Sequence, residues 1–348
     1  MPPSNPLELR VGLIGFGTVG SAFARVLAER SADLARRYGL RLALDQVAVA
    51  RPDVARSGAG AARVHGDPSR LAADPDLDIV VEATGALAAA AWLRSAHGRG
   101  ATVVTANKQA LVSDPLLLEA LARHDPRLLC EAAAGGAVPV VRALRESLAA
   151  DRVRELRGVL NGTTTFVLSR LAEGGSLAAA VAEAQRKGYA EADPSYDLEG
   201  RDAAAKLAIL STLAWGEPIG LDRIAIRGLE EDVEHTVRAA RQGGRRVRLV
   251  ARAREIPAPA AGSTTGASTP TALEATVAAE TLEATDPLAA TDGVENVVEV
   301  EAALAGRLLW RGAGAGGRAT ASALLADTLA AARAIAAERS ARPEEAVR

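Results

Sequence analysis

Cysteine is nearly absent from this sequence: Cys130 is the only one in 348 residues, so no internal disulfide can form. The four histidines, His65, His97, His124 and His235, are scattered and do not have the spacing of zinc ligands. These shortages exclude a disulfide scaffold and argue against a zinc enzyme.

Aromatic residues are also scarce, with three each of Phe, Tyr and Trp, and the formal net charge is -2. Nucleic-acid-binding proteins usually need a basic surface and rings that stack on bases. No run of 18 or more apolar residues lacks a charge, and the first residues have neither the basic start nor the apolar core of a signal peptide. We therefore expect a cytoplasmic protein that acts on a small molecule, with no nucleic-acid or membrane partner.

Lysine is rare, because only Lys108, Lys187 and Lys206 are lysines among the 41 basic residues. Arginine evidently serves as the general surface cation. Lysine offers a compact ammonium whose pKa can be shifted toward neutrality, which arginine cannot. The three lysines are therefore candidates for a chemical role, and the alternative is that they were retained by chance.

The 348-residue chain is long enough for about two domains. Its first part alternates short apolar segments with helical ones. The candidate strands are 8–15, 42–50, 79–83 and 102–105, and the candidate helices are 18–30, 86–96 and 115–123. Such alternation predicts an α/β fold, with a Rossmann-type doubly wound parallel sheet covered by helices on both faces.

The pattern changes after Pro139. The later segments are predicted helices at 140–149, 204–214 and 319–338, and predicted strands at 153–160, 247–253, 273–279 and 295–301. We expect a nucleotide-binding domain of residues 1–139, completed by 310–348, and an α+β substrate-binding and dimerisation domain of residues 140–309. Residues 257–270, rich in Ala, Gly, Ser, Thr and Pro, are expected to form a flexible loop.

A glycine-rich turn joins the first predicted strand to the first predicted helix. It consists of Gly15, Phe16, Gly17, Thr18, Val19 and Gly20. This spacing is typical of dinucleotide-binding loops, in which the glycines permit a tight turn, close approach of the pyrophosphate and helix–strand contact. After the second strand, Arg51 favours NADP because its cation can pair with the 2'-phosphate. Asp53 is also compatible with NAD, because an acidic residue can bind the ribose hydroxyls.

Several further segments do not follow from the fold alone. They are 105–108, 131–139, 158–166, 187–206 and 314–323. In order and spacing, these segments and the glycine-rich turn resemble homoserine dehydrogenases over nearly the whole chain, and all three lysines lie within them. The resemblance implies NADP- or NAD-dependent interconversion of aspartate 4-semialdehyde and homoserine, on the route to threonine, methionine and isoleucine. The chain resembles the short form, which has no C-terminal regulatory domain.

Asp202 and Lys206 are four residues apart, so they can pair on one face of a helix. An ordinary surface ion pair is the simple alternative. The resemblance implies that both residues serve proton transfer at the substrate oxygen. That chemistry is reasonable, because an aldehyde oxygen becomes negative as hydride reaches the carbon, and an ammonium supplies both a field and a proton.

Two acidic residues match substrate-binding residues of the family, Glu191 and Asp197. The resemblance implies that their carboxylates hold the substrate ammonium. They could instead be loop charges near the turn at Asp193.

Nicotinamide-side residues are expected where the predicted parallel strands end. Lys108 follows strand 102–105 and resembles the family's active-site lysine between nicotinamide and substrate. Thr84 and Gly85 follow the preceding strand, and Gly316 lies in the late glycine-rich segment. The resemblance implies that all four contact the cofactor.

Residues 131–138 resemble a monovalent-cation loop. Glu131 and the carbonyls of Ala134, Gly136 and Val138 would ligate sodium, and oxygen-only ligation suits a hard cation. The alternative is a glycine-rich hinge between the domains.

Two rival functions stay open at this point. One is aspartate semialdehyde dehydrogenase, which needs a nucleophilic cysteine, and Cys130 has no histidine near it in sequence. The other is a noncatalytic nucleotide-sensing protein, against which the retained lysines argue. Pairing of the second-domain sheet would produce a homodimer.

Overall fold

The computed structural model describes residues 6–54, 58–229, 232–257 and 271–341. The chain forms two compact units: unit 1 consists of Met1–Ala137 and Gly316–Arg348, and unit 2 of Val138–Ala315. Apart from Pro257, the loop expected at 257–270 lies outside the described residues.

Unit 1 contains a six-stranded sheet in the order β3-β2-β1-β4-β5-β6, and every described pairing in it is parallel. The strands are β1 (Leu7–Ile14), β2 (Leu40–Ala48), β3 (Arg63–His65), β4 (Ile79–Glu82), β5 (Thr102–Thr105) and β6 (Leu128–Leu129). The chain reverses its winding direction between β1 and β4, which is where ligands bind in sheets of this order. The predicted doubly wound fold is confirmed.

The helices of unit 1 pack on this sheet or on one another. They are α1 (Thr18–Tyr38), α2 (Pro68–Ala73), α3 (Ala89–Gly98), α4 (Lys108–Ser113), α5 (Pro115–Ala122), α6 (Glu131–Ala134) and α13 (Gly317–Ala341). Helix α1 runs well beyond the predicted end at residue 30, because a left-handed glycine that can end it, Gly39, comes only after Tyr38.

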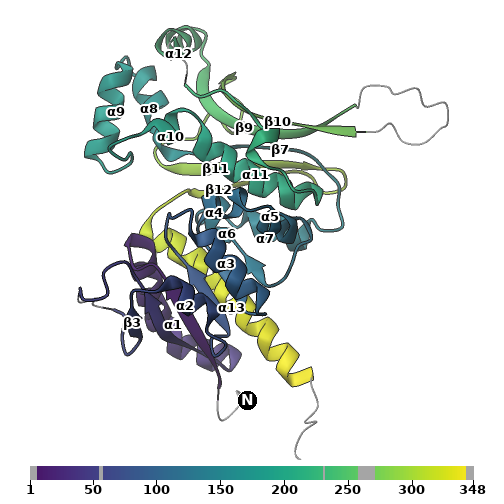
Figure 1. Cartoon of the computed structure of the whole chain (residues 1–348). Coiled ribbons are helices and arrows are strands. Elements are labelled where there is room, and N and C mark those ends of the chain that lie inside the picture. Colours follow the sequence, from purple (N-terminus) through teal and green to yellow (C-terminus); the bar gives the residue numbers. More distant parts are fainter. Residues whose placement is uncertain (1–5, 55–57, 230–231, 258–270, 342–348) are drawn as a thin grey trace, which may run out of the picture. The chain divides into compact units, whose positions relative to one another are not determined.

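The C-terminal helix α13 packs along α1 (Figure 1). By length and composition alone it could cross a membrane. However, its residues Ala321, Leu324 and Ala331 are buried in the same core as Leu9 and Phe23. A core helix of this kind passes the length and hydropathy test for the same reason that a membrane helix does.

Unit 2 is built on a mixed six-stranded sheet in the order β12-β11-β7-β9-β10-β8. Its strands are β7 (Val153–Val159), β8 (Ala225–Ile226), β9 (Arg246–Pro257), β10 (Thr271–Leu282), β11 (Glu295–Ala302) and β12 (Gly306–Ala313). All pairings are antiparallel except that of β8 with β10. The edge strand β12, absent from the sequence prediction, pairs with β11 along its whole length.

The helical segments of unit 2 include one that is almost wholly buried. They are α7 (Val140–Arg142), η1 (Ala143–Ser147), α8 (Gly162–Ala172), α9 (Leu177–Arg186), α10 (Ser195–Leu198), α11 (Arg201–Trp215), η2 (Leu221–Arg223) and α12 (Val233–Gln242). The predicted helix 140–149 is thus one short α-helical turn followed by a π-helical turn. Helix α11 contacts β7, β9 and β10 (Figure 1). Because it begins at Arg201, both Asp202 and Lys206 lie on it.

Candidate functional site

The glycine-rich turn has the geometry of a dinucleotide loop. Gly15 has φ +95°, and an added Cβ would lie 2.8 Å from the carbonyl oxygen of Ala83. A Cβ at Gly20 would lie 2.1 Å from the carbonyl oxygen of Gly15, so only glycine allows α1 to approach β1 this closely. These two glycines fix the turn.

The middle glycine leaves space for a ligand. Gly17 is exposed, and a Cβ added there would meet nothing within 4 Å. Gly17 is also the N-cap of α1 and provides no side-chain hydrogen bond, and the first turn holds no acidic residue. The first amides of α1 therefore face an open, uncapped helix end that suits a pyrophosphate.

Gly316 lies beside this turn within unit 1. Its backbone has φ +125°, and its carbonyl oxygen accepts a hydrogen bond from Thr320 N at the start of α13. A Cβ at the next residue, Gly317, would lie 3.2 Å from the carbonyl oxygen of Thr18. Arg51 and Asp53 are both exposed beyond the end of β2, where the ribose of a dinucleotide is recognised in this fold.

A buried carboxylate organises the carboxyl ends of β4 and β5. Glu82 is fully buried, and its oxygens accept hydrogen bonds from Thr84 N (2.7 Å), Thr84 Oγ1 (2.6 Å) and Thr105 Oγ1 (2.5 Å). Asn107 Nδ2 donates a longer one, of 3.4 Å. Burial raises the pKa of Glu82 above its usual value, and these hydrogen bonds oppose the rise.

The three lysines have different surroundings. Lys108 is half-buried and is the first residue of α4, which Asn107 caps by accepting a hydrogen bond from Ala110 N. The side chain of Lys187 is 48% exposed and pairs with Glu183 on α9. The side chain of Lys206 is only 11% exposed. Lys206 is therefore much less exposed than Lys187.

Lys206 is held by two short hydrogen bonds. Its Nζ donates to Asp202 Oδ2 at 2.8 Å and to the carbonyl oxygen of Leu160 at 2.6 Å. An ammonium has three N–H groups, and within the described part of the chain these two bonds leave one N–H for another acceptor. Because the Asp202 side chain is only 9% exposed, the pair is not a solvated surface pair.

Asn161 joins the two carboxylates of this region. Its Nδ2 donates to Asp202 Oδ2 at 2.9 Å and to Asp197 Oδ1 at 2.7 Å, while its Oδ1 caps α8 by accepting from Thr164 N. Burial first, and then the charge of Asp202, raise the pKa of Asp197. The structure thus brings together Asp197, Asp202 and Lys206 through an asparagine.

The segment before α10 contributes the remaining predicted residue of unit 2. Glu191 is exposed, and its backbone carbonyl accepts a hydrogen bond from Gln185 Nε2. Thr163 Oγ1, on α8, donates to the carbonyl oxygen of Tyr189 at 2.7 Å. These contacts attach the Glu191 segment to α8 and α9.

The predicted cation loop begins at α6. Glu131 and Ala134 are buried, Gly136 has φ +66°, and the carbonyl oxygen of Val138 accepts from Val140 N. Asp327 Oδ2, on α13, accepts a hydrogen bond from Glu131 N at 2.8 Å. The segment thus contains a buried glutamate and backbone carbonyls, and both are hard oxygen donors.

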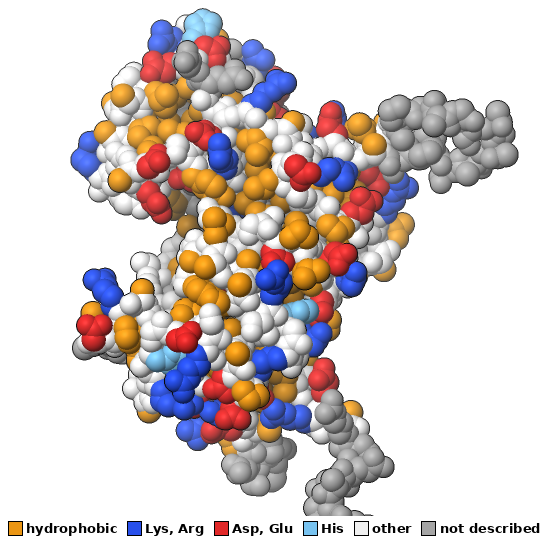
Figure 2. Space-filling view, in the orientation of Figure 1, with side chains coloured by type: hydrophobic (Ala, Val, Ile, Leu, Met, Phe, Trp, Pro, Cys, Tyr) orange, Lys and Arg blue, Asp and Glu red, His pale blue; other side chains and the backbone are white. Residues whose placement is uncertain are grey.

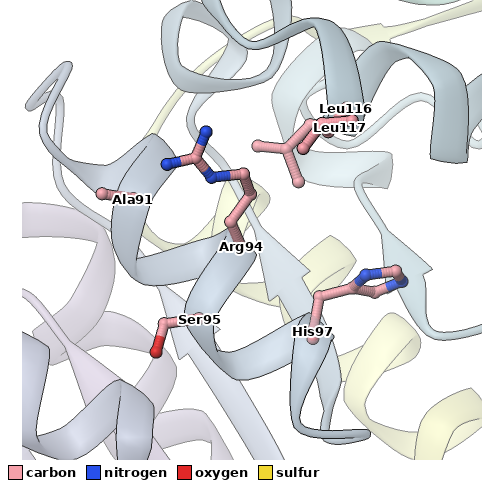
Figure 3. Close-up of a pocket in the computed structure, with 7 residues that line it drawn as sticks. Ala91, Arg94, Ser95, His97, Leu116 and Leu117 are labelled. Carbon is pink, nitrogen blue, oxygen red and sulfur yellow. The ribbon is translucent and has the colours of Figure 1, made fainter.

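A shallow hollow of about 420 Å³ lies apart from these residues, between α3 and α5 (Figure 3). It is lined by Ala91, Arg94, Ser95, His97, Gly98, Leu116 and Leu117. Arg94 pairs with Asp114, and His97 Nε2 lies 3.0 Å from Asp125 Oδ2, so both side chains already have an acidic partner. None of the predicted site residues lines this hollow.

Sequence reasoning assigned no role to Glu82, Asn107 or Asn161. The two asparagines lie in segments 105–108 and 158–166, which carry the family resemblance, but an amide side chain has no sequence pattern that reveals its partners. A sequence signal did exist for both asparagines: each directly precedes a helix, at a position where asparagine is a preferred cap.

Comparisons with known proteins agree over both units. A family model described as homoserine dehydrogenase matches residues 139–329, and one described as the homoserine dehydrogenase NAD binding domain matches residues 15–131. A homoserine dehydrogenase from Neisseria gonorrhoeae is 36% identical over 334 residues, which is 95% of this chain and 74% of the relative. One from Corynebacterium glutamicum is 37% identical over 326 residues, which is 93% of this chain and 72% of the relative.

Solved structures give the same result. The chain is similar to a homoserine dehydrogenase from Thiobacillus denitrificans with a TM-score of 0.85, 35% identity and coverage of 99% of this chain and 77% of that one. It is also similar to a hyperthermophilic archaeal homoserine dehydrogenase in complex with NADPH. For that structure the TM-score is 0.75 and the identity 25%, and the match covers 93% of this chain and 98% of the other.

Proposed function

This chain belongs to the homoserine dehydrogenase family, and from that premise we propose which of its residues perform each part of the reaction. The activity is that of an NAD(P)-dependent oxidoreductase that interconverts aspartate 4-semialdehyde and homoserine. The observation that supports the assignment most strongly is the buried network of Lys206, Asp202 and Asn161.

Lys206 is the proton carrier. Two of its N–H groups are bound to Asp202 and to the Leu160 carbonyl, and the third suits a substrate oxygen. As hydride reaches the aldehyde carbon, the ammonium stabilises the negative oxygen and protonates it. In the other direction, the neutral amine accepts the proton of the alcohol. Asp202 keeps the ammonium in place.

Asp197 and Glu191 hold the substrate ammonium. A carboxylate binds an ammonium through a charge-assisted hydrogen bond. Asp197 is turned toward Asn161, and burial first and then the charge of Asp202 raise its pKa, so a substrate cation would stabilise its charged form. Glu191 is exposed on the segment before α10 and is accessible to a ligand.

Unit 1 binds the cofactor. The residues assigned to it are Gly15, Phe16, Gly17, Thr18, Val19, Gly20, Arg51, Thr84, Gly85, Lys108 and Gly316. The open, uncapped start of α1 fits the pyrophosphate, and when bound the nicotinamide donates or accepts the hydride. Thr84 and Gly85 follow β4 and Lys108 follows β5, at the carboxyl edge of the sheet.

NADP is the preferred cofactor. Arg51 is the first charged residue beyond β2 and is exposed, so its guanidinium can pair with a 2'-phosphate. The archaeal relative in complex with NADPH supports this choice.

Residues 131–138 bind a sodium ion. The ligands are the Glu131 carboxylate and the carbonyls of Ala134, Gly136 and Val138. Buried oxygen donors and the left-handed Gly136, which turns the backbone at this point, support the assignment.

The enzyme is a cytoplasmic homodimer that pairs through the sheet of unit 2. Helix α11 packs on one side of this sheet. In register across β7, β11 and β12 lie Arg157, Glu299 and Leu309, and Leu309 is 46% exposed. On the face shown in Figure 2, Lys and Arg side chains are interspersed with Asp and Glu and form no continuous basic surface, which argues against nucleic acid as a partner. A monomer mass by light scattering would contradict the dimer.

The test of the reaction is the absorbance of NADPH or NADH after addition of aspartate 4-semialdehyde. We expect oxidation by the parent and a kcat reduced by about 10²-fold or more in Asp202→Asn, because the amide keeps the size but not the charge that holds Lys206. No oxidation of either cofactor by the parent would contradict the activity. A fully active Asp202→Asn variant would contradict only the site.

A further inference from the structure

Glu82 is a fully buried carboxylate at the end of β4, and the mechanism described above does not use it. Burial of a carboxylate is unfavourable unless hydrogen bonds compensate for the lost hydration. The other residues of β4, Ile79, Val80 and Val81, are apolar and equally buried. Packing of the strand alone therefore does not require a carboxylate at position 82, and what it does require depends on the groups that donate hydrogen bonds to it.

The side chain of Glu82 accepts hydrogen bonds from Thr105, the last residue of β5, and from the segments that directly follow β4 and β5. One oxygen accepts from both the backbone amide and the hydroxyl of Thr84, and the other accepts from the Thr105 hydroxyl. Thr84 in turn lies against the glycine-rich turn, because a Cβ at Gly15 would be 2.7 Å from its Cγ2. The carboxylate thus fixes the loop that follows β4.

A second chain of hydrogen bonds leads from Glu82 to Lys108. The Thr105 hydroxyl donates to Glu82 and accepts from Asn107 N at 2.9 Å. Asn107 Nδ2 donates to the Ala86 carbonyl at 2.9 Å and, at longer range, to Glu82. Since Asn107 caps the helix that begins with Lys108, these bonds set the direction in which that lysine leaves the sheet edge.

We propose that Glu82 is the positioning residue of the nicotinamide edge: it holds Thr84 and, through Thr105 and Asn107, orients Lys108. The inference rests on the proposed function of Thr84 and Lys108. It adds that neither residue is placed correctly without a buried acceptor at position 82. Misplacement of a reacting group by about 1 Å can lower a rate by about 10²-fold.

The experiment removes one link without emptying the core. Thr105→Val keeps a β-branched side chain in β5 and deletes the hydroxyl between Glu82 and Asn107, whereas Thr105→Ser keeps the hydroxyl. Thr102→Val makes the same exchange at the buried opposite end of the strand and is the matched control. Glu82→Gln tests the acceptor itself, because an amide nitrogen cannot accept a hydrogen bond from a neighbouring donor.

Two measurements are needed, one without cofactor. In the cofactor-free protein, we expect faster hydrogen–deuterium exchange of the peptide that contains α4 in Thr105→Val and Glu82→Gln, and unchanged exchange in Thr105→Ser and Thr102→Val. In steady-state kinetics, the first two variants should lose about 10- to 100-fold in kcat. Parent-like exchange and kcat in Thr105→Val would overturn the inference, even if Glu82→Gln fails to fold.

Combination with Lys108→Ala separates this inference from the proposed function. If Glu82 acts through Lys108, Thr105→Val should reduce kcat by less than about 3-fold in the Lys108→Ala background. Full additivity would overturn the inference while leaving Lys108 in its role. A fully active Lys108→Ala single variant would instead refute the proposed function of Lys108. Catalysis would then not depend on how Lys108 is oriented.

Discussion

Replacement of Lys206 by arginine tests the proton-transfer role while keeping the positive charge. The parent ammonium fits between Asp202 Oδ2 at 2.8 Å and the Leu160 carbonyl at 2.6 Å, in a site where the lysine side chain is 11% exposed. Arginine carries a larger planar group that does not lose its proton at working pH. The protein itself uses arginine for nearly every other cation, so the exchange would be tolerated if Lys206 served only as a positive charge on the helix.

The size of the expected effect follows from these contacts. Loss of a positioned general acid and base lowers turnover by about 10²- to 10⁴-fold. The ion pair with Asp202 can persist and helix propensity hardly changes. The bulkier group in a nearly buried site should lower the free energy of unfolding by only about 1–3 kcal/mol. Activity should therefore fall far more than stability.

The assay is steady-state kinetics in both directions, together with a thermal melt of each variant. Arg201→Lys is the control, because Arg201 starts the same helix and its side chain is 62% exposed. A folded Lys206→Arg protein with parental kcat would refute the assignment of Lys206 as the proton carrier and would make Lys108 the next candidate.

Three further predictions concern other parts of the site. Asn161→Asp keeps the cap of α8 but replaces two N–H donors by a third carboxylate, so we expect urea denaturation to show a loss of about 3 kcal/mol; an unchanged midpoint would contradict the bridge. Arg51→Asp should lower the ratio of kcat/KM for NADPH over NADH by about 10- to 100-fold, and an unaltered ratio would exclude Arg51 from the 2'-phosphate site. Glu131→Ala should make activity less responsive to sodium chloride than the parent, relative to choline chloride at equal ionic strength. The same response in both proteins would remove the cation assignment.

The sequence alone determined the class of fold in the first unit. Apolar segments such as 79–83 and 102–105 alternate with helical ones, and a glycine-punctuated turn follows the first strand. These signals are local: strand periodicity, helix periodicity and glycine conformation each depend on a few neighbouring residues. The scarcity of lysine also indicates, without any knowledge of contacts, that Lys108 and Lys206 are candidates for a chemical role.

Only the tertiary structure decided which polar groups are buried and what they contact. A glutamate at the end of an apolar strand is usually solvated, and nothing in residues 79–82 indicated that Glu82 is fully buried. Asn161 meets two carboxylates that are 36 and 41 residues away in the chain. The edge strand β12 likewise depends on pairing with β11 for its existence, since its side chains are mostly exposed or half-buried. Such partners are set by the packing of distant segments, which local propensity does not encode.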